Sequence, residues 1–165
     1  MREGERGYVD TDVFLSYLDE HPTRVDVIQA LLDQALEGRY QLYTSVATIA
    51  EVAFAATEKT GQALDPEVEE AMDELWSPAS PIIVVELFPE IAIQARKLVR
   101  DGMVTNRRIK PFDAIHLATA VHLKVDALIT YNLADFDRWE ADLATRVEHP
   151  SVQQPPLQAE GLAGL

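Results

Sequence analysis

Four oxygen-bearing side chains, spread widely along the sequence, are candidates for metal-ion or acid–base chemistry. They are Asp10, Glu51, Asp113 and Asn132. Hard divalent cations such as Mg²⁺ prefer carboxylate and amide oxygens as ligands, and carboxylates can also move protons during catalysis. None of the four indicates a function on its own, so the question is whether the fold brings them together.

Asp113 and His116 share one face of a helix predicted over 111–124. Pro111 is accepted in the first turn of a helix, where its missing N–H would be unpaired anyway. The rest of the segment is apolar nearly all round, as in a buried helix, and a buried carboxylate must be paired, ligated or protonated. Asp113 is also explained as an acid that complements the helix dipole by about 0.3–1 kcal/mol. We interpret His116 as a hydrogen-bonded core histidine rather than a metal ligand, because no second imidazole lies at metal-binding spacing.

Length and composition indicate one globular domain. With 165 residues, 47% of them hydrophobic, the chain can bury a substantial core; we assign 1–149 to a single domain and 150–165 to a flexible tail. The absence of cysteine excludes disulfides and thiolate metal sites. No apolar run approaches the roughly 20 residues that span a bilayer, and the charged segment 1–7 lacks a signal core. We therefore expect a cytoplasmic protein with no membrane partner.

The formal net charge of −14 argues against a nucleic-acid partner unless the charges are segregated along the chain. Six of the 14 basic residues lie just before Asp113: Arg96, Lys97, Arg100, Arg107, Arg108 and Lys110. The stretch 60–95 contains acids and no base. A basic patch beside Asp113 can guide a phosphate, although the same residues are equally explained as a solvated helix face and loop.

Short apolar runs alternate with helical patterns along the chain. Strands are predicted at 7–9, 40–43, 82–85 and 127–130, with an optional edge strand at 146–148; helices are predicted at about 13–18, 22–38, 45–61, 65–76, 89–102 and 111–124. The unbroken β-branched run 82–85 predicts a strand buried on both faces. This order predicts a three-layer α/β sandwich with a central, mainly parallel sheet of four or five strands flanked by helices.

Such a fold brings the candidate residues to one edge of the sheet. In right-handed βαβ units the N-termini of helices lie beside the C-termini of strands, and ligands of open α/β sheets bind at that edge. Asp10 and Asn132 follow predicted strands and Asp113 opens a helix, so these three side chains should converge. Glu51, about two turns into its predicted helix, can reach the same place from the side.

Four segments carry a resemblance to a known family: VDTD at 9–12, TIAEV at 48–52, KPFDAIHLATA at 110–120 and LITYNLADF at 128–136. In this order and spacing they resemble the PIN domain, in particular the toxin-type (VapC-like) ribonucleases of bacterial toxin–antitoxin pairs. The resemblance covers about residues 7–140. It implies a PIN-like fold and a metal-dependent endoribonuclease that hydrolyses RNA phosphodiester bonds with Mg²⁺ or Mn²⁺. It also implies a homodimer that is held inactive by a cognate antitoxin protein.

The resemblance further implies roles for individual residues. Asp10, Glu51 and Asp113 fall on the acidic metal-site positions of the family. Asp10 and Asp113 would hold one ion, and Glu51 a second ion or the attacking water. The residues expected to bind substrate are Thr130, Lys110, Arg107 and Arg108.

Asn132 departs from the commonest family pattern, in which an acid lies two residues after the threonine that ends the fourth strand. An amide supplies a carbonyl oxygen but no charge, so the number of metal ions stays open. We expect Asn132 to act as an outer metal ligand ahead of Asp135, which matches the family's Asp-Phe pair. Asp12 is interpreted as a turn residue or first-turn cap rather than a ligand.

Two other functions stay open. Asp10 and Asp12 after a strand also match the nucleophile and general acid of a haloacid-dehalogenase-type phosphatase, although no acidic pair follows a later strand to complete that site. Alternatively, the chain is a PIN-fold binding module in which Asn132 marks lost catalysis.

Overall fold

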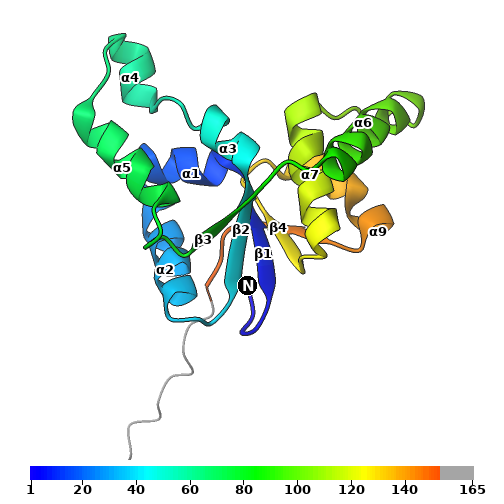
Figure 1. Cartoon of the computed structure of the whole chain (residues 1–165), viewed down its shortest axis with the longest axis horizontal. Coiled ribbons are helices and arrows are strands. Elements are labelled where there is room, and N and C mark those ends of the chain that lie inside the picture. Colours follow the sequence, from blue (N-terminus) through cyan, green and yellow to red (C-terminus); the bar gives the residue numbers. More distant parts are fainter. Residues whose placement is uncertain (153–165) are drawn as a thin grey trace, which may run out of the picture.

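A parallel sheet of five strands forms the centre of the molecule (Figure 1). In this computed structural model, which describes residues 1–152, the strands lie in the order β3 (Ile82–Val85), β2 (Gln41–Ser45), β1 (Arg6–Val9), β4 (Ala127–Ile129) and β5 (Arg146–Glu148). All four neighbouring pairs are parallel. The predicted α/β sandwich is confirmed, and the optional strand is present as β5 at one edge of the sheet.

Helices cover both faces of this sheet. One face carries α1 (Thr11–Leu18), α2 (Val25–Leu36) and α5 (Pro66–Trp76); the other carries α6 (Pro89–Val104), α7 (Pro111–Leu123), α8 (Leu133–Phe136), the 3₁₀ helix η1 (Asp137–Trp139) and α9 (Glu140–Leu143). Figure 1 shows the two groups on opposite sides of the strands, with α3 (Val46–Glu51) directly after β2 and α4 (Ala56–Gly61) further out.

Successive residues of the central strands divide the core into two apolar layers. Tyr8 and Leu128 belong to the layer that contains α6 and α7, whereas Val9 and Ile129 belong to the layer that contains α1 and α2. Neighbouring side chains on a strand point to opposite faces, so a parallel sheet with helices on both sides needs apolar residues throughout. Because helices pack on both faces, the positions of the strand ends at the carboxyl edge of the sheet are well defined.

The helix predicted over 45–61 is divided in the structure into α3 and α4. α3 ends at Glu51, and Ala55 in the connection is 1% exposed. α4 then begins with its own capping contact, in which the Glu58 carboxylate accepts the N–H of Ala55 at 3.1 Å. Tertiary burial and capping override the helical periodicity here, so Glu51 is the last residue of a short helix rather than the middle of a long one.

Strand β3 lies at the other edge of the sheet, which corrects the prediction that the run 82–85 is buried on both faces. Within the described part of the chain it pairs with β2 alone, and Ile83 is 45% exposed. A β-branched run indicates a strand, but its place in the sheet is set by the crossover connections, which local composition does not encode.

The ends of the described chain lie together. The amino group of Met1 donates to the hydroxyl and the carbonyl of Ser151, at 3.1 and 3.4 Å. Most of the tail predicted at 150–165 lies outside the described residues. Among residues 1–152, no helix has the length and apolar character needed to cross a membrane.

Candidate metal centre at the carboxyl edge of the sheet

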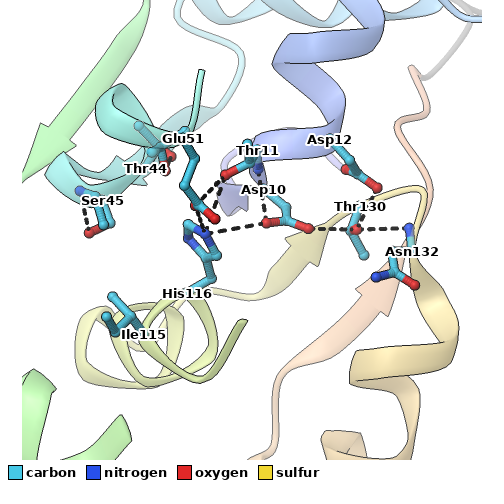
Figure 2. A network of polar contacts seen from close by, with 12 residues as sticks. Asp10, Thr11, Asp12, Thr44, Ser45, Glu51, Ile115, His116, Thr130 and Asn132 are labelled. Atoms are coloured by element: carbon cyan, nitrogen blue, oxygen red, sulfur yellow. Dashed lines mark hydrogen bonds and ion pairs between the residues drawn. The ribbon is translucent and has the colours of Figure 1, made fainter. Parts of the chain in front are cut away.

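Asp10 joins the end of β1 to the start of α1. Its backbone N–H donates to the carbonyl of Ile129 at 3.0 Å, which continues the pairing with β4. One carboxylate oxygen caps α1 by accepting the N–H of Thr11 at 2.8 Å, and the other accepts a hydrogen bond from Thr130 Oγ1 at 2.9 Å (Figure 2). Asp10 is therefore held in a fixed orientation while only 5% exposed.

Burial makes the ionised form of Asp10 costly. Desolvation raises its pKa to about 6 and the nearby charge of Asp12 adds to the rise, whereas His116 and the hydrogen bonds from Thr130 and Thr11 oppose it. Because its ionised form is incompletely stabilised by its neighbours, the buried Asp10 carboxylate would be stabilised by a cation.

Glu51, at the end of α3, reaches the same place from the neighbouring strand. Its Oε2 accepts hydrogen bonds from Thr11 Oγ1 at 2.8 Å and shares a 2.5 Å contact with His116 Nε2 (Figure 2). Burial alone would raise the pKa of Glu51, but the hydrogen bond and charge of His116, with the bond from Thr11, lower it overall. Glu51 is thus favoured as a carboxylate.

His116 is the point at which the acidic side chains meet. It is 1% exposed; its Nδ1 lies 2.7 Å from the hydroxyl of Tyr8, and its Nε2 lies 3.7 Å from Asp10 Oδ1. Burial alone would lower the pKa of His116, yet the hydrogen bond with Glu51 and the charges of Asp10, Glu51 and Asp113 raise it overall. The sequence interpretation placed His116 in the core but missed that its partners are the acids of the site. Its spacing of three from Asp113 was the available signal.

Asp113 lies in the first turn of α7 and is half-buried. Its Oδ2 is buried and has no hydrogen-bond partner within residues 1–152. Desolvation raises the pKa of Asp113, and the charges of Asp135 and Glu51 act in the same direction, whereas Lys110 and His116 oppose the rise. A buried carboxylate oxygen without a hydrogen-bond partner, among other acids, is suited to contact a positive ion.

Asn132 and Asp135 form a pair at the start of α8. The Asn132 side-chain amide donates to Asp135 Oδ2 at 2.7 Å, and its backbone N–H donates to Thr130 Oγ1 at 2.9 Å. Because the NH₂ group is committed to Asp135, the carbonyl oxygen is the part of the Asn132 side chain that remains available as a ligand.

Asp12 stabilises the loop that follows β4. Its carboxylate accepts the N–H of Tyr131 at 3.0 Å, and it lies 3.2 Å from Thr130 Oγ1, whose one proton it shares with the closer Asp10. Asp12 lies in the first turn of α1, but the cap of that helix is Asp10. The two aspartates thus have different contacts: Asp10 lies among the acids of the site, and Asp12 binds the loop that follows β4.

The three basic residues expected to bind substrate have different surroundings. Arg107 forms an ion pair with Asp142 and lies 4.4 Å over the ring of Trp139. Arg108 and Lys110 are exposed, and Lys110 is close enough to lower the pKa of Asp113. Within residues 1–152, Arg107 is engaged by Asp142 and Trp139, whereas Arg108 and Lys110 are exposed at the surface.

The loop that carries these bases folds back onto α6 at Gly102. The N–H of Arg107 donates to the carbonyl of Gly102 at 2.9 Å. A Cβ atom at position 102 would collide with the carbonyl oxygen of Arg107. The close approach requires glycine, and it directs the chain through Lys110 into α7.

The carboxylate and amide oxygens at this edge are the ligand types that a hard divalent cation prefers, but the side chains do not converge as closely as ligands of one ion. Within residues 1–152 no group of three His, Asp or Glu side chains is arranged to hold an ion. Instead, His116 lies between Asp10 and Glu51. Burial is the main cause of the raised pKa values of Asp10 and Asp113, and Asp113 Oδ2 has no hydrogen-bond partner among the described residues, so a cation would stabilise both carboxylates. Asp10, Glu51, Asp113 and Asn132 are the residues that could hold Mg²⁺ or Mn²⁺.

The sequence model of the PIN domain matches residues 7–140. The chain therefore belongs to the PIN domain family, and its parallel sheet with acids at the carboxyl edge agrees with that assignment. No curated protein sequence matches this chain.

Solved structures of toxin–antitoxin proteins have a similar fold. VapBC2 from Rickettsia felis, bound to a DNA fragment from its promoter, is 13% identical, with a TM-score of 0.65 over 87% of this chain and 98% of that chain. DNA-bound VapBC from Salmonella typhimurium is 16% identical, with a TM-score of 0.63 over 88% and 98%. VapC20 from Mycobacterium tuberculosis, described as a sarcin–ricin loop cleaving toxin, is 17% identical, with a TM-score of 0.52 over 74% and 86%. At such identities the likeness defines the fold, which is that of a VapC-like PIN domain.

Proposed function

We propose that this protein is a metal-dependent endoribonuclease and the toxin of a toxin–antitoxin pair, acting in the cytoplasm. The observation that carries the proposal is the meeting of Asp10 and Glu51 around His116, one helical turn from Asp113, at the carboxyl edge of a PIN-domain sheet. Among the similar structures, one is described as a sarcin–ricin loop cleaving toxin and others as VapBC, which supports the same class of activity here.

Asp10 and Asp113 would hold Mg²⁺ or Mn²⁺, with the carbonyl oxygen of Asn132 as an outer ligand. When bound, the ion would lower the pKa of a water molecule and offset the charge of the phosphate. The protein's contribution is orientation: Thr130 and the N–H of Thr11 hold Asp10 in one position.

Glu51 is suited to orient the attacking water or to hold a second ion. Both of its hydrogen bonds end on Oε2, so Oε1 is the oxygen that can accept a proton from water. Hydrolysis would add that water to phosphorus and break one P–O bond of the RNA backbone.

Asp135 would support the fourth position. Asn132 brings no charge, but Asp135 is hydrogen-bonded to it and raises the pKa of Asp113. The negative charge that an acid at position 132 would supply is thus present three residues later, while Asn132 keeps the place of the outer ligand.

The RNA backbone would contact the exposed residues Arg108 and Lys110 beside Asp113. Phosphate contacts from Lys and Arg supply most of the sequence-independent affinity for nucleic acids. Lys110 directly precedes α7, so a phosphate that it binds lies near Asp113.

A largely apolar groove with acidic residues in its lining lies between α3, α4 and α5 and suits the antitoxin partner. It has a volume of about 330 Å³ and is lined mainly by apolar residues, with acids among them: Ile49, Val52, Ala53, Phe54, Leu64, Met72, Trp76, Glu58, Glu69 and Asp73. Phe54 and Leu64 are exposed. An amphipathic antitoxin segment that combines apolar residues with Lys or Arg would match both features.

A homodimer is proposed from exposed apolar side chains on other elements. Large apolar side chains are exposed on β3, α6, α7 and the β3–α6 connection: Ile83, Leu87, Phe88, Ile93 and Phe112. Monomeric proteins rarely expose many such side chains together. Light scattering after size exclusion should give twice the chain mass, and Phe88→Glu with Ile93→Glu should give the monomer.

The test of the activity is cleavage of a structured RNA by the purified protein, with Mn²⁺ or with a chelator. We expect cleavage with Mn²⁺, none with the chelator, and none by Asp10→Asn or Asp113→Asn. Asp101→Asn changes an exposed acid on α6 and is the matched control. Folded Asp10→Asn and Asp113→Asn proteins that cut RNA as fast as the parent would contradict the assignment of the site, and a parent without any cleavage would favour the binding module.

The phosphatase alternative is not favoured, because Asp12 is committed elsewhere. In that mechanism Asp12 must act as the general acid, but its carboxylate accepts hydrogen bonds from the N–H of Tyr131 and from Thr130. Rapid turnover of a small phosphate monoester without RNA cleavage would reverse this conclusion.

A further inference from the structure

His116 connects the interior of the sheet to Glu51. Its Nδ1 lies 2.7 Å from the hydroxyl of Tyr8, and its Nε2 lies 2.5 Å from Glu51 Oε2. The Tyr8 hydroxyl also accepts the N–H of Ser45 at 3.0 Å, and Ser45 is the N-cap of α3. Tyr8 and His116 are both almost completely buried. Core hydrogen bonds therefore fix His116 and the start of α3 relative to each other.

Glu51 has few other restraints. It is the last residue of α3, a helix of only six residues, and the next residue, Val52, has left the helical conformation. Helix ends fray, and a glutamate side chain loses considerable rotamer freedom when it is held in place. Apart from His116, the hydrogen bond from Thr11 is the one that holds the Glu51 carboxylate within residues 1–152.

The two hydrogen bonds to Glu51 end on the same oxygen. Thr11 Oγ1 and His116 Nε2 both contact Oε2, while the described residues give Oε1 no hydrogen bond. The Glu51 side chain keeps 26% exposure. A carboxylate anchored through one oxygen presents the other in a defined direction, and here His116 also lies 3.7 Å from Asp10 Oδ1.

We propose that His116 is a positioning residue: held by Tyr8, it fixes one oxygen of Glu51 so that the other serves the site that Asp10 and Asp113 form at the carboxyl edge of the sheet. The inference rests on the proposed function in that Glu51 takes part in cleavage. It adds a residue that contacts neither ion nor RNA and acts through Glu51. Loss of this support lets the Glu51 carboxylate turn among several rotamers, so ion affinity and cleavage rate fall together.

Two amide substitutions separate the two contacts of His116. The side-chain amide of asparagine occupies the position of Nδ1 and can keep the contact with Tyr8, whereas that of glutamine reaches the position of Nε2 and can keep the contact with Glu51. We expect His116→Asn to lower kcat and Mn²⁺ affinity by about 10- to 100-fold, the usual effect of removing a residue that orients a metal ligand. The KM for RNA should stay constant. His116→Gln should lower kcat and Mn²⁺ affinity by no more than about threefold, which is a much smaller loss than the one expected for His116→Asn.

Unfolding of the metal-free protein gives a readout that needs no activity. In a chelator, a cycle of parent, His116→Asn, Glu51→Gln and the double variant measures the coupling between the two side chains. We expect Glu51→Gln to cost stability in the parent and little in the His116→Asn background. Additive effects would overturn the proposal, and so would a His116→Gln variant that loses as much Mn²⁺ affinity as His116→Asn.

Tyr8→Phe provides the test if His116→Asn fails to fold. This change removes only the hydroxyl that supports Nδ1, and it should lower Mn²⁺ affinity less than the loss of His116 does. Unchanged Mn²⁺ affinity in Tyr8→Phe would contradict the role of Tyr8. If no variant and no parent cleaves RNA, the proposed function fails, whereas the coupling in unfolding still decides whether His116 positions Glu51.

Discussion

The acids at the carboxyl edge of the sheet and the acids of α5 carry the same charge in opposite surroundings. Asp10 is buried and desolvation raises its pKa, and Asp113 has a buried oxygen without a hydrogen-bond partner in the described part of the chain. The acids of α5 are all exposed: Glu67, Glu69, Glu70, Asp73 and Glu74. Water and salt screen exposed charges strongly.

Affinity for a cation is expected to depend on the burial of the acids rather than on their number. The exposed acids of α5 contribute to the net charge of −14, and because water screens them they cost little. At the edge of the sheet, the fold holds a few carboxylates where water cannot fully compensate them. The cost of burying these carboxylates would be offset by a bound ion, which would stabilise the folded state.

The sharpest test of this difference is neutralisation of one acid in each region. Asp113→Asn should lower RNA cleavage by more than about 100-fold, because even residues that only orient a metal ligand are worth roughly 10- to 100-fold. Glu70→Gln on α5 should leave the rate within about twofold, since an exposed charge contributes little. Initial rates with Mn²⁺ measure both. Equal losses in the two variants would remove the distinction between the regions.

Ion binding should stabilise the fold only through the edge of the sheet. At a Mn²⁺ concentration of 100 times Kd, the free energy of unfolding should rise by about 2.7 kcal/mol. Asp10→Asn should lose most of this gain, although asparagine still caps α1, whereas Glu70→Gln should keep it. Urea unfolding with and without Mn²⁺ gives the values. A gain that survives in Asp10→Asn would place the ion elsewhere.

The pH dependence of stability in a chelator reports on the buried carboxylate of Asp10 together with its neighbours, and the Asp10→Asn variant separates its share. The folded pKa of Asp10 is about 6 against an ordinary value of 3.8, so between these values the folded state binds more protons than the unfolded state. Its contribution to stability is therefore fully present below the lower value and is lost as pH rises through 6, by on the order of 3 kcal/mol. The raised pKa of His116 acts in the same direction, while the lowered pKa of Glu51 opposes it.

Asp10→Asn removes the titrating group and should flatten this decline. The free energy of unfolding of parent and variant should therefore differ most near neutral pH, with the variant the more stable of the two. Urea titrations from pH 4 to 7 make the comparison. Parallel curves would mean that Asp10 does not titrate as its burial requires.

The smallest effects are expected from the bases beside Asp113. Arg108→Gln should weaken RNA binding a few-fold at low salt and reduce the salt dependence by about one unit of slope. Arg107→Gln, which breaks the ion pair with Asp142 and the packing on Trp139, should lower stability and leave the salt slope unchanged. Fluorescence anisotropy of a labelled RNA measures the slopes. A larger slope change for Arg107→Gln than for Arg108→Gln would exchange their roles.

Much of the fold could be predicted from local patterns. Apolar runs gave the strands, and proline or a capping residue marked helix starts at Pro66, Pro89 and Pro111. The division of the segment 45–61 could not be predicted, because it depends on burial and on a cap from Glu58. The edge position of β3 likewise depends on connections between distant segments.

The candidate site could be predicted only in part, because its position follows from the order of strands and helices but its hydrogen bonds do not. The rule that strand ends and helix starts meet at one edge places Asp10 and Asp113 there, and the structure does bring Asp10 and Glu51 to the same histidine. The hydrogen bond of His116 to Glu51 needs side-chain directions that spacing alone does not supply. The contact between Asn132 and Asp135 is visible in sequence only as a separation of three residues.

The turn at Gly102 has a consequence for how the protein can change. A single methyl group there would push Arg107 away from α6, and the chain that follows would enter α7 along another path. The reach of Lys110 toward RNA and the placement of Asp113 would then shift together. Evolution or design can alter the bases of this loop one by one, but the path of the backbone that carries all of them depends on the absence of a side chain at position 102.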